Sequence, residues 1–311
     1  MSFLIRCALF PDWRPNMRFC RQVVARWFSI ISLLCVAFAL GGCSAVRLGY
    51  NNAPTVAYWW LDRFFEFDSA QGDRVQADLQ TLHAWHRAEE LPQILTLLQK
   101  LRVATPQPTT PEQLCDLYGE LKIRAEVALD RLVPTMAAIT PTMADAQIEH
   151  IAQAFEKRNR TWQEDWLDGT PAQRAERRAK QMVNRAEAFY GSLSDTQVAL
   201  VQAHVNASDV DADAIYRARV LRKNDALQTL RALRDNPAAT QTDRETDLRA
   251  LLVRAMNPVD PEMRESWGRW TAQSCAGVAA LHNSSSAAQR AQLVENLQNY
   301  EEDVQALIGQ R

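Results

Sequence analysis

Two histidines and a carboxylate fall on one face of a predicted helix in the N-terminal third of the chain. His83, His86 and Glu90 are spaced at i, i+3 and i+7, so a helix presents all three on one side. Imidazole and carboxylate groups bind zinc, and the trio is therefore a candidate metal site for a metal-dependent hydrolase. The alternative is a polar network, formed by Arg87 with Glu90 and by histidine with aspartate, that joins two helices.

The sequence lacks the other signatures of catalysis. It contains no HExxH, GxSxG, GxGxxG or P-loop motif. Its 311 residues include only ten glycines, which disfavours loops that wrap a phosphate group. We therefore expect a protein that is not an enzyme, has no catalytic residues and needs no cofactor.

Cys43 closes a segment whose order is typical of a secretory signal. Arginines precede an apolar run, residues 27–40, that is too short to span a bilayer. Residues Leu40-Gly41-Gly42-Cys43 resemble the bacterial lipobox. The resemblance implies transfer of a diacylglyceryl group to the Cys43 thiol, cleavage after Gly42, and acylation of the new amine by a fatty acid such as palmitate. The alternative to a lipoprotein signal is a plain secretory signal. Translation starts either at Met1 or at Met17.

The residue after the cysteine predicts the destination. In the sorting rule for such Gram-negative lipoproteins, an aspartate here retains the protein in the inner membrane, so Ser44 implies the outer membrane. Several acyl chains anchor a protein stably. Removing residues 1–42 leaves 30 basic and 36 acidic side chains, and this net charge of −6 does not attract nucleic acid. We expect a protein bound to the outer membrane through its lipid and facing the periplasm.

Three short motifs between residues 50 and 92 carry a second resemblance. They are Tyr50-Asn51-Asn52, Trp59-Trp60-Leu61-Asp62-Arg63 and Trp85-His86-Arg87-Ala88-Glu89-Glu90-Leu91-Pro92. Together with the lipobox, they resemble an uncharacterised family of proteobacterial outer-membrane lipoproteins. The resemblance implies a location and a helical fold, and it assigns no activity.

The side chains of these motifs are candidate interaction residues. A helix rich in tryptophan close to the anchor contacts either a membrane or an envelope protein, or it is buried under the other helices. The candidates are Trp59, Trp60, Asp62, Arg63, Trp85, His86, Arg87 and Glu90.

Basic residues gather in the middle of the chain. Arg174, Arg177, Arg178 and Arg185 form a candidate positive face for an anionic envelope component such as lipid headgroups. The alternative is a solvated face whose arginines pair with glutamates one helical turn away.

A short motif offers another function. Leu193-Ser194-Asp195-Thr196-Gln197, echoed at residues 143–147, resembles the Leu-Thr-x-x-Gln signature of small helical periplasmic stress chaperones. The resemblance implies a holder of unfolded proteins. A helix capping box predicts the same residues for folding reasons alone, and Ala144 cannot act as a cap.

Two cysteines follow the lipobox, Cys115 and Cys275. The periplasm is oxidising, so they form either a disulfide or two buried free thiols.

The elements that position these residues are all predicted to be helices. Apolar residues recur every three or four positions, for example from Leu114 to Leu132, and no segment alternates as a strand does. Capping boxes at Thr110, Thr170, Ser194 and Ser286 mark helix starts. We predict nine or ten helices in an all-α bundle. The predicted parts are a signal peptide (1–42), an anchor linker (43–52), a helical hairpin (53–104) and a helical bundle (110–311).

Overall fold

The computed structural model describes residues 45–310, and every regular element in that range is a helix. Residues 1–44, which contain the predicted signal peptide and the candidate lipidation residues Gly42 and Cys43, lie outside the described residues. The chain divides into two compact units, residues 1–49 and residues 50–311. No described helix is both long and apolar enough to cross a membrane.

The all-α prediction is confirmed, with eleven α-helices of 13–23 residues in the described range instead of nine or ten. One reason is the π-helix η1 (His86–Glu90), which divides one helical stretch into α4 and α5. These helices are α3 (Ala53–Phe65), α4 (Ser69–Trp85), α5 (Leu91–Ala104), α6 (Pro111–Asp130), α8 (Asp145–Trp166), α9 (Pro171–Tyr190), α10 (Asp195–Ala207), α11 (Ala212–Arg234), α12 (Gln241–Met256), α13 (Pro261–Asn283) and α14 (Ala287–Gly309).

Three shorter helices complete the described chain. Helix α2 (Ala45–Asn51) lies within the predicted anchor linker. Helix α7 (Val133–Ile139) and the 3-10 turn η2 (Thr140–Thr142) connect α6 to α8.

The predicted capping boxes are present at the helix starts. The hydroxyls of Thr110, Thr170, Ser194 and Ser286 each accept a hydrogen bond from the backbone N–H of a glutamine three residues on. That glutamine in turn accepts a bond from the cap residue's backbone N–H. Each box satisfies two backbone donors that the first helical turn leaves unpaired. Asp68 begins α4 in the same way, with Gln71 as its partner.

Two pairs of these helix starts are joined by their glutamines. The amide of Gln147 donates to Gln71 Oε1 at 2.7 Å, and it also donates to the carbonyl of Glu66, just before α4. Gln71 donates in return to the carbonyl of Thr142, just before α8. Gln197 and Gln289 exchange two bonds of 2.9 Å in the same manner, so the starts of α10 and α14 are also joined.

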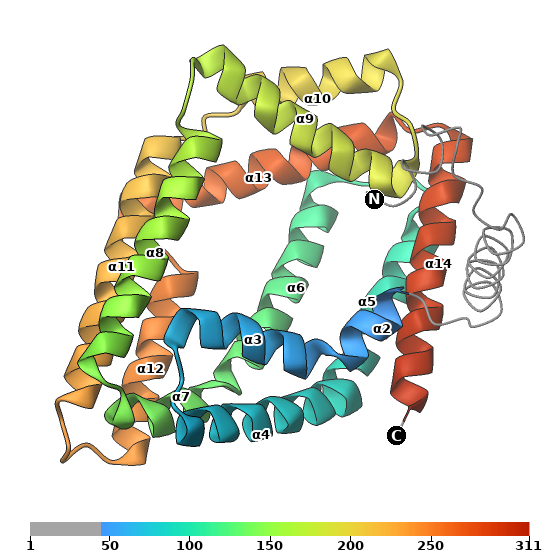
Figure 1. Cartoon of the computed structure of the whole chain (residues 1–311). Coiled ribbons are helices and arrows are strands. Elements are labelled where there is room, and N and C mark those ends of the chain that lie inside the picture. Colours follow the sequence, from blue (N-terminus) through green and yellow to red (C-terminus); the bar gives the residue numbers. More distant parts are fainter. Residues whose placement is uncertain (1–44, 311) are drawn as a thin grey trace, which may run out of the picture. The chain divides into compact units, whose positions relative to one another are not determined.

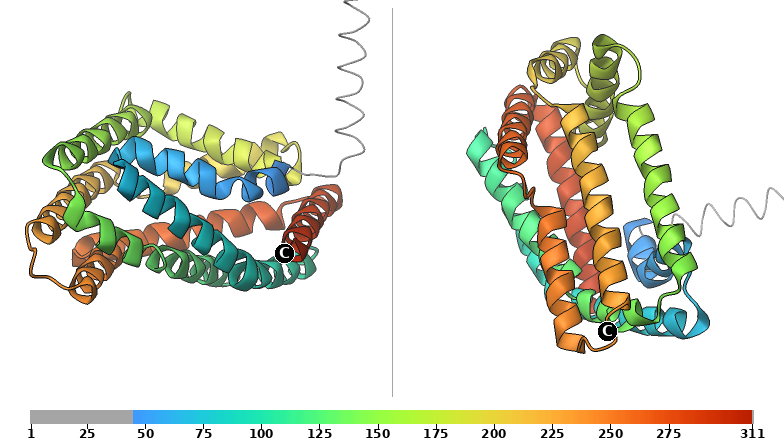
Figure 2. Two further views of the ribbon diagram at one scale, coloured as in Figure 1. Left: turned by 60° about the horizontal axis from the view of Figure 1, so that its bottom comes forward. Right: turned by 90° about the vertical axis from the view of Figure 1, so that its left-hand side faces the viewer.

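The apolar core consists of several clusters in the unit formed by residues 50–311. Met136 of α7 packs against three of them, which contain Ile151 of α8, Leu248 of α12 and Leu79 of α4 respectively. A fourth cluster joins α5 to α14 around Leu307. Figure 2 shows α8, α11 and α12 side by side. Residues of α8 and α11 form most of the first cluster, and α7, α11 and α12 form the second.

Helix α6 packs differently from its neighbours. It runs from α13 to α12 (Figure 1), and none of its residues is buried. The predicted apolar stripe is therefore only partly covered: Tyr118 and Leu121 are exposed. Cys115 of α6 and Cys275 of α13 form a disulfide, with their Cα atoms 5.7 Å apart. The sequence had left that pairing open.

Candidate functional site

An exposed apolar face lies on α3. Val56, Trp59 and Trp60 are spaced at i, i+3 and i+4, and 55%, 63% and 53% of their surfaces are exposed. We call these three residues the tryptophan face. Of the alternatives that the sequence left open, burial under the other helices does not hold for these side chains. Large exposed apolar patches mark sites of protein or membrane contact.

A cation stacks beside the tryptophan face. The guanidinium of Arg158, on α8, lies 5.0 Å from the ring of Trp60 and 5.7 Å from the ring of Phe64. The two rings are themselves stacked, with centroids 6.1 Å apart. Cation–π contacts of this kind hold an arginine in place at a partly exposed surface.

Tyr50 brings the first and third motifs together. Its hydroxyl lies 3.0 Å from Nδ1 of His86, and its carbonyl accepts a bond from Nε2 of His83 at 3.0 Å. Arg87 lies over the Tyr50 ring and donates to the Asn51 side chain at 2.7 Å. We call Tyr50, His83, His86 and Arg87 the Tyr50 cluster.

Residues of the Tyr50 cluster and the adjacent Asn51 also form hydrogen bonds with Gln310, which follows α14. Arg87 donates to the carbonyl of Gln310 at 2.8 Å, and Asn51 donates to the Gln310 side chain at 3.1 Å. Tyr50 further packs against the apolar cluster around Leu307. Arg87 and both histidines take part in this arrangement, so it agrees with part of the polar network that the sequence offered as the alternative to a metal site; Glu90 does not take part.

The candidate metal trio does not converge. His83 and His86 are turned to Tyr50, whereas Glu90 is buried and lies 3.6 Å from Arg124 of α6. Among the described residues no three His, Cys, Asp or Glu side chains are grouped so that they could hold a metal. The spacing on one helix face is correct, but the π-helix η1 and the separate partners direct these side chains to different neighbours.

The remaining motif residues, Asp62, Arg63 and Trp85, contact the turn between α3 and α4 and residues of neighbouring segments. Asp62 accepts a bond from the backbone N–H of Phe67 at 3.2 Å, which supports the turn at Glu66, where φ is +48°. Arg63 is exposed, and its carbonyl accepts a bond from His150. Trp85 lies under the guanidinium of Arg131 at 4.5 Å.

The Tyr50 cluster makes stability depend on pH. Burial lowers the pKa of His86, and burial together with the Arg87 charge lowers the pKa of His83. These histidines therefore bind protons more readily in the unfolded chain than in the folded one. Their contribution to the free energy of unfolding is complete above the ordinary histidine pKa, and it falls as the pH drops below about 6.5. Urea unfolding at pH 7.5 and pH 5.5 measures this loss.

Substitutions test whether His83 and His86 cause this loss of stability at low pH. A His83→Gln/His86→Gln double variant is expected to lose less stability than the wild type over the same pH interval. An unchanged pH dependence in the double variant would contradict the assignment.

The candidate basic face is partly engaged within the protein. Arg174 donates to the carbonyl of Leu167 at 2.9 Å, and Arg177 donates to the carbonyl of Asp168 at 2.5 Å. Both bonds satisfy carbonyls at the C-terminal end of α8, where cations are favoured. Burial lowers the pKa of Arg178, and Arg185 is exposed.

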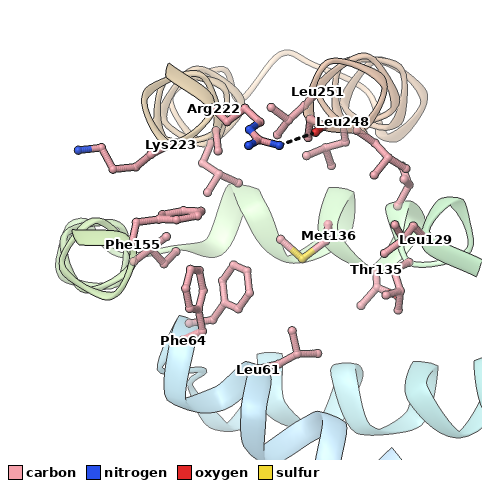
Figure 3. Close-up of a pocket in the computed structure, with 18 of the residues that line it drawn as sticks. Leu61, Phe64, Leu129, Thr135, Met136, Phe155, Arg222, Lys223, Leu248 and Leu251 are labelled. Atoms are coloured by element: carbon pink, nitrogen blue, oxygen red, sulfur yellow. Dashed lines mark hydrogen bonds between the residues drawn. The ribbon is translucent and has the colours of Figure 1, made fainter. Parts of the chain in front are cut away.

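The structure contains a cavity of about 670 Å³ that was not among the sites predicted from the sequence. Its wall combines residues of α3, α4, α6, α7, α8, α11 and α12. Figure 3 shows Met136 of α7 between Leu61 of α3 and Leu251 of α12, with Phe64 and Phe155 facing one another nearby. Cavities of this size and apolar character are typical of small-molecule sites.

Residues 63–255 match a family of unknown function, DUF6279, and this match covers more than half of the chain. The chain belongs to this family. No match was found among curated proteins or among solved structures. The prediction of an uncharacterised family is therefore confirmed, whereas the lipobox and the motif pattern stay predictions. The DUF6279 match takes in all of the cavity wall except Leu61, and it begins after the tryptophan face.

Sequence reasoning missed the cavity because its wall is assembled from seven helices. Each contributing stripe has ordinary amphipathic spacing, and nothing in such spacing tells whether facing stripes meet or leave space between them. One signal was present. Asn159 interrupts the apolar stripe of α8 and is buried. A buried side-chain amide among apolar residues needs a hydrogen-bond partner.

Proposed function

We propose that this chain is a lipid-anchored lipoprotein of the periplasmic face of the outer membrane, and that it acts by binding and not by catalysis. The observation that carries the proposal is the exposure of the tryptophan face. Trp59 and Trp60 belong to α3, which begins ten residues after the candidate lipidation residue Cys43. A lipid on that cysteine would keep the tryptophan face near the bilayer.

Chemistry supports an envelope contact for this surface. Tryptophan combines a large apolar ring with a polar N–H, which suits sites that are apolar at one end and wet at the other. Arg158 on the Trp60 ring and the exposed Arg63 add positive charge beside it. The proposed partner is therefore an envelope protein or an anionic envelope component reached from the membrane surface.

In-cell crosslinking tests the proposal on the full chain. We place a photo-crosslinking amino acid in place of Trp59 and expect a discrete crosslinked product in the outer-membrane fraction. The matched control carries the same amino acid in place of Val253 of α12, which is 60% exposed. We expect this position to give at least about fivefold less product, since stable contacts bury apolar surface.

The anchor is tested in the same cells. Cys43→Ala is expected to remove incorporation of labelled palmitate and to weaken the crosslink from position 59, because the face is then no longer held at the membrane. Equal crosslinking from positions 59 and 253 would count against the tryptophan face. Absence of palmitate label in the wild type would count against the anchor.

A further inference from the structure

The cavity on α7 has an apolar wall and a cationic side. Leucine, phenylalanine and methionine side chains line most of it, among them Leu61, Phe64, Met136 and Leu251. Arg158 of α8 and Arg219, Arg222 and Lys223 of α11 line it as well. Arg158 and Arg222 are exposed, so this side is where the cavity meets solvent.

Both carboxylates in the cavity wall are neutralised inside the protein. Asp78 pairs with Arg74 at 2.6 Å and accepts a bond from Thr135 at 2.7 Å. Asp225 receives two bonds, of 2.9 and 3.0 Å, from Arg254. Neither acid is therefore available to balance the arginines.

Three arginines remain without a carboxylate. Lys223 pairs with Glu156, whereas Arg158, Arg219 and Arg222 form no ion pair with any described residue. We call these three the cation cluster. Burial lowers the pKa of Arg219, and the charges of Arg222 and Arg158 lower it further. An anion placed among them would relieve this mutual repulsion.

Two buried donors in the cavity wall also lack partners. Asn159 is only 3% exposed, and its Nδ2 makes no hydrogen bond with a described residue. Nε of Arg219 is buried and unbonded in the same way. A buried donor without an acceptor is costly, so these groups favour a ligand that brings oxygen atoms.

We propose that the cavity binds a single-chain anionic amphiphile, with its alkyl chain against the apolar wall and its carboxylate or phosphate at the cation cluster. The volume suits one small molecule of this kind. Guanidinium groups pair well with both head groups, and the bond is charge-assisted. Arg158 touches both the cavity and the ring of Trp60, so the ligand site adjoins the tryptophan face.

Native mass spectrometry of the full chain, released from detergent, tests the proposal. The probes are palmitate, a lysophosphatidylglycerol with the same acyl chain, and hexadecanol. We expect one palmitate or lysophospholipid per chain, and the tighter of the two identifies the head group as carboxylate or phosphate. Hexadecanol should bind at least about tenfold more weakly, since it lacks the charge-assisted bonds. Myristate should bind about fifteenfold more weakly than palmitate, or about fourfold for each methylene removed.

Two variants test the cation cluster and the apolar part of the cavity separately. Arg219→Gln is expected to weaken the better anionic probe about tenfold and to leave hexadecanol unchanged. Arg217→Gln, exposed on the same helix, is the matched control and should bind as the wild type does. Ala226→Phe, in the cavity wall, should block every probe by filling the space.

Several results would overturn the proposal. They are equal binding of hexadecanol and palmitate, wild-type affinity in Arg219→Gln, and no binding of either anionic probe to the wild type. If Ala226→Phe does not fold, as judged by circular dichroism, the Arg219→Gln comparison decides alone. The proposal does not depend on the lipid anchor, so it can fail or succeed separately from the crosslinking test.

Discussion

Cys115→Ser is expected to lower the free energy of unfolding by about 2–5 kcal/mol. The disulfide joins residues 160 positions apart, and a link across so long a loop strongly restricts the unfolded chain. In the folded protein the disulfide also fixes α6, a helix that has no buried residue, to α13. Urea unfolding of the oxidised protein and of the variant measures the difference.

Apart from the Arg124–Glu90 pair, the ion pairs between α6 and other helices lie at the surface. Lys100 pairs with Glu120 at 2.6 Å, and both side chains are exposed; such surface pairs contribute about 0–1 kcal/mol each. Cys275→Ser should therefore cost as much as Cys115→Ser, and the double variant should cost no more than either one. A double variant whose loss equals the sum of the two would show that the cysteines act separately.

Gln147→Leu should destabilise the protein by about 2–4 kcal/mol, the second largest effect we expect. The buried amide donates to Glu66 O at 2.8 Å and to Gln71 Oε1 at 2.7 Å, and it accepts a bond from the backbone N–H of Ala144. Leucine leaves these groups buried and unpaired. Thermal or urea unfolding gives the loss.

Gln173→Leu is the matched control for this substitution. Gln173 completes the capping box of α9 but is exposed and joins no second helix start, so its loss should cost about 1 kcal/mol or less. The Gln71→Leu/Gln147→Leu double variant should lose less than the two single variants together, since both members of the pair are then apolar. Equal losses at Gln147 and Gln173 would mean that the pairing adds nothing.

The paired glutamines also bear on the chaperone-like motif. Gln147 and Gln197 are its glutamines, and both are buried in contacts between helix starts. These contacts agree with the capping-box interpretation of the motif, and the chaperone-like function stays a prediction.

The helix starts were predictable because capping is local. Thr110, Thr170, Ser194 and Ser286 interact with residues three positions away, and this distance along the chain does not depend on the rest of the fold. The absence of strands among residues 45–310 followed from apolar spacing, which is equally local. One boundary within the N-terminal hairpin was missed, because the π-helix η1 has no capping residue to announce it.

The sequence by itself determined the all-α class, most helix starts and the two cysteines able to pair. Only the tertiary structure decided which surfaces are covered. The spacing of Val56, Trp59 and Trp60 is the same for a buried stripe and for an exposed one, because periodicity defines a face and not its neighbour. Local spacing likewise does not predict three other features: the Gln71–Gln147 pair, the cation cluster and the apolar cavity. Each joins residues that are far apart along the chain, and their meeting depends on how whole helices pack.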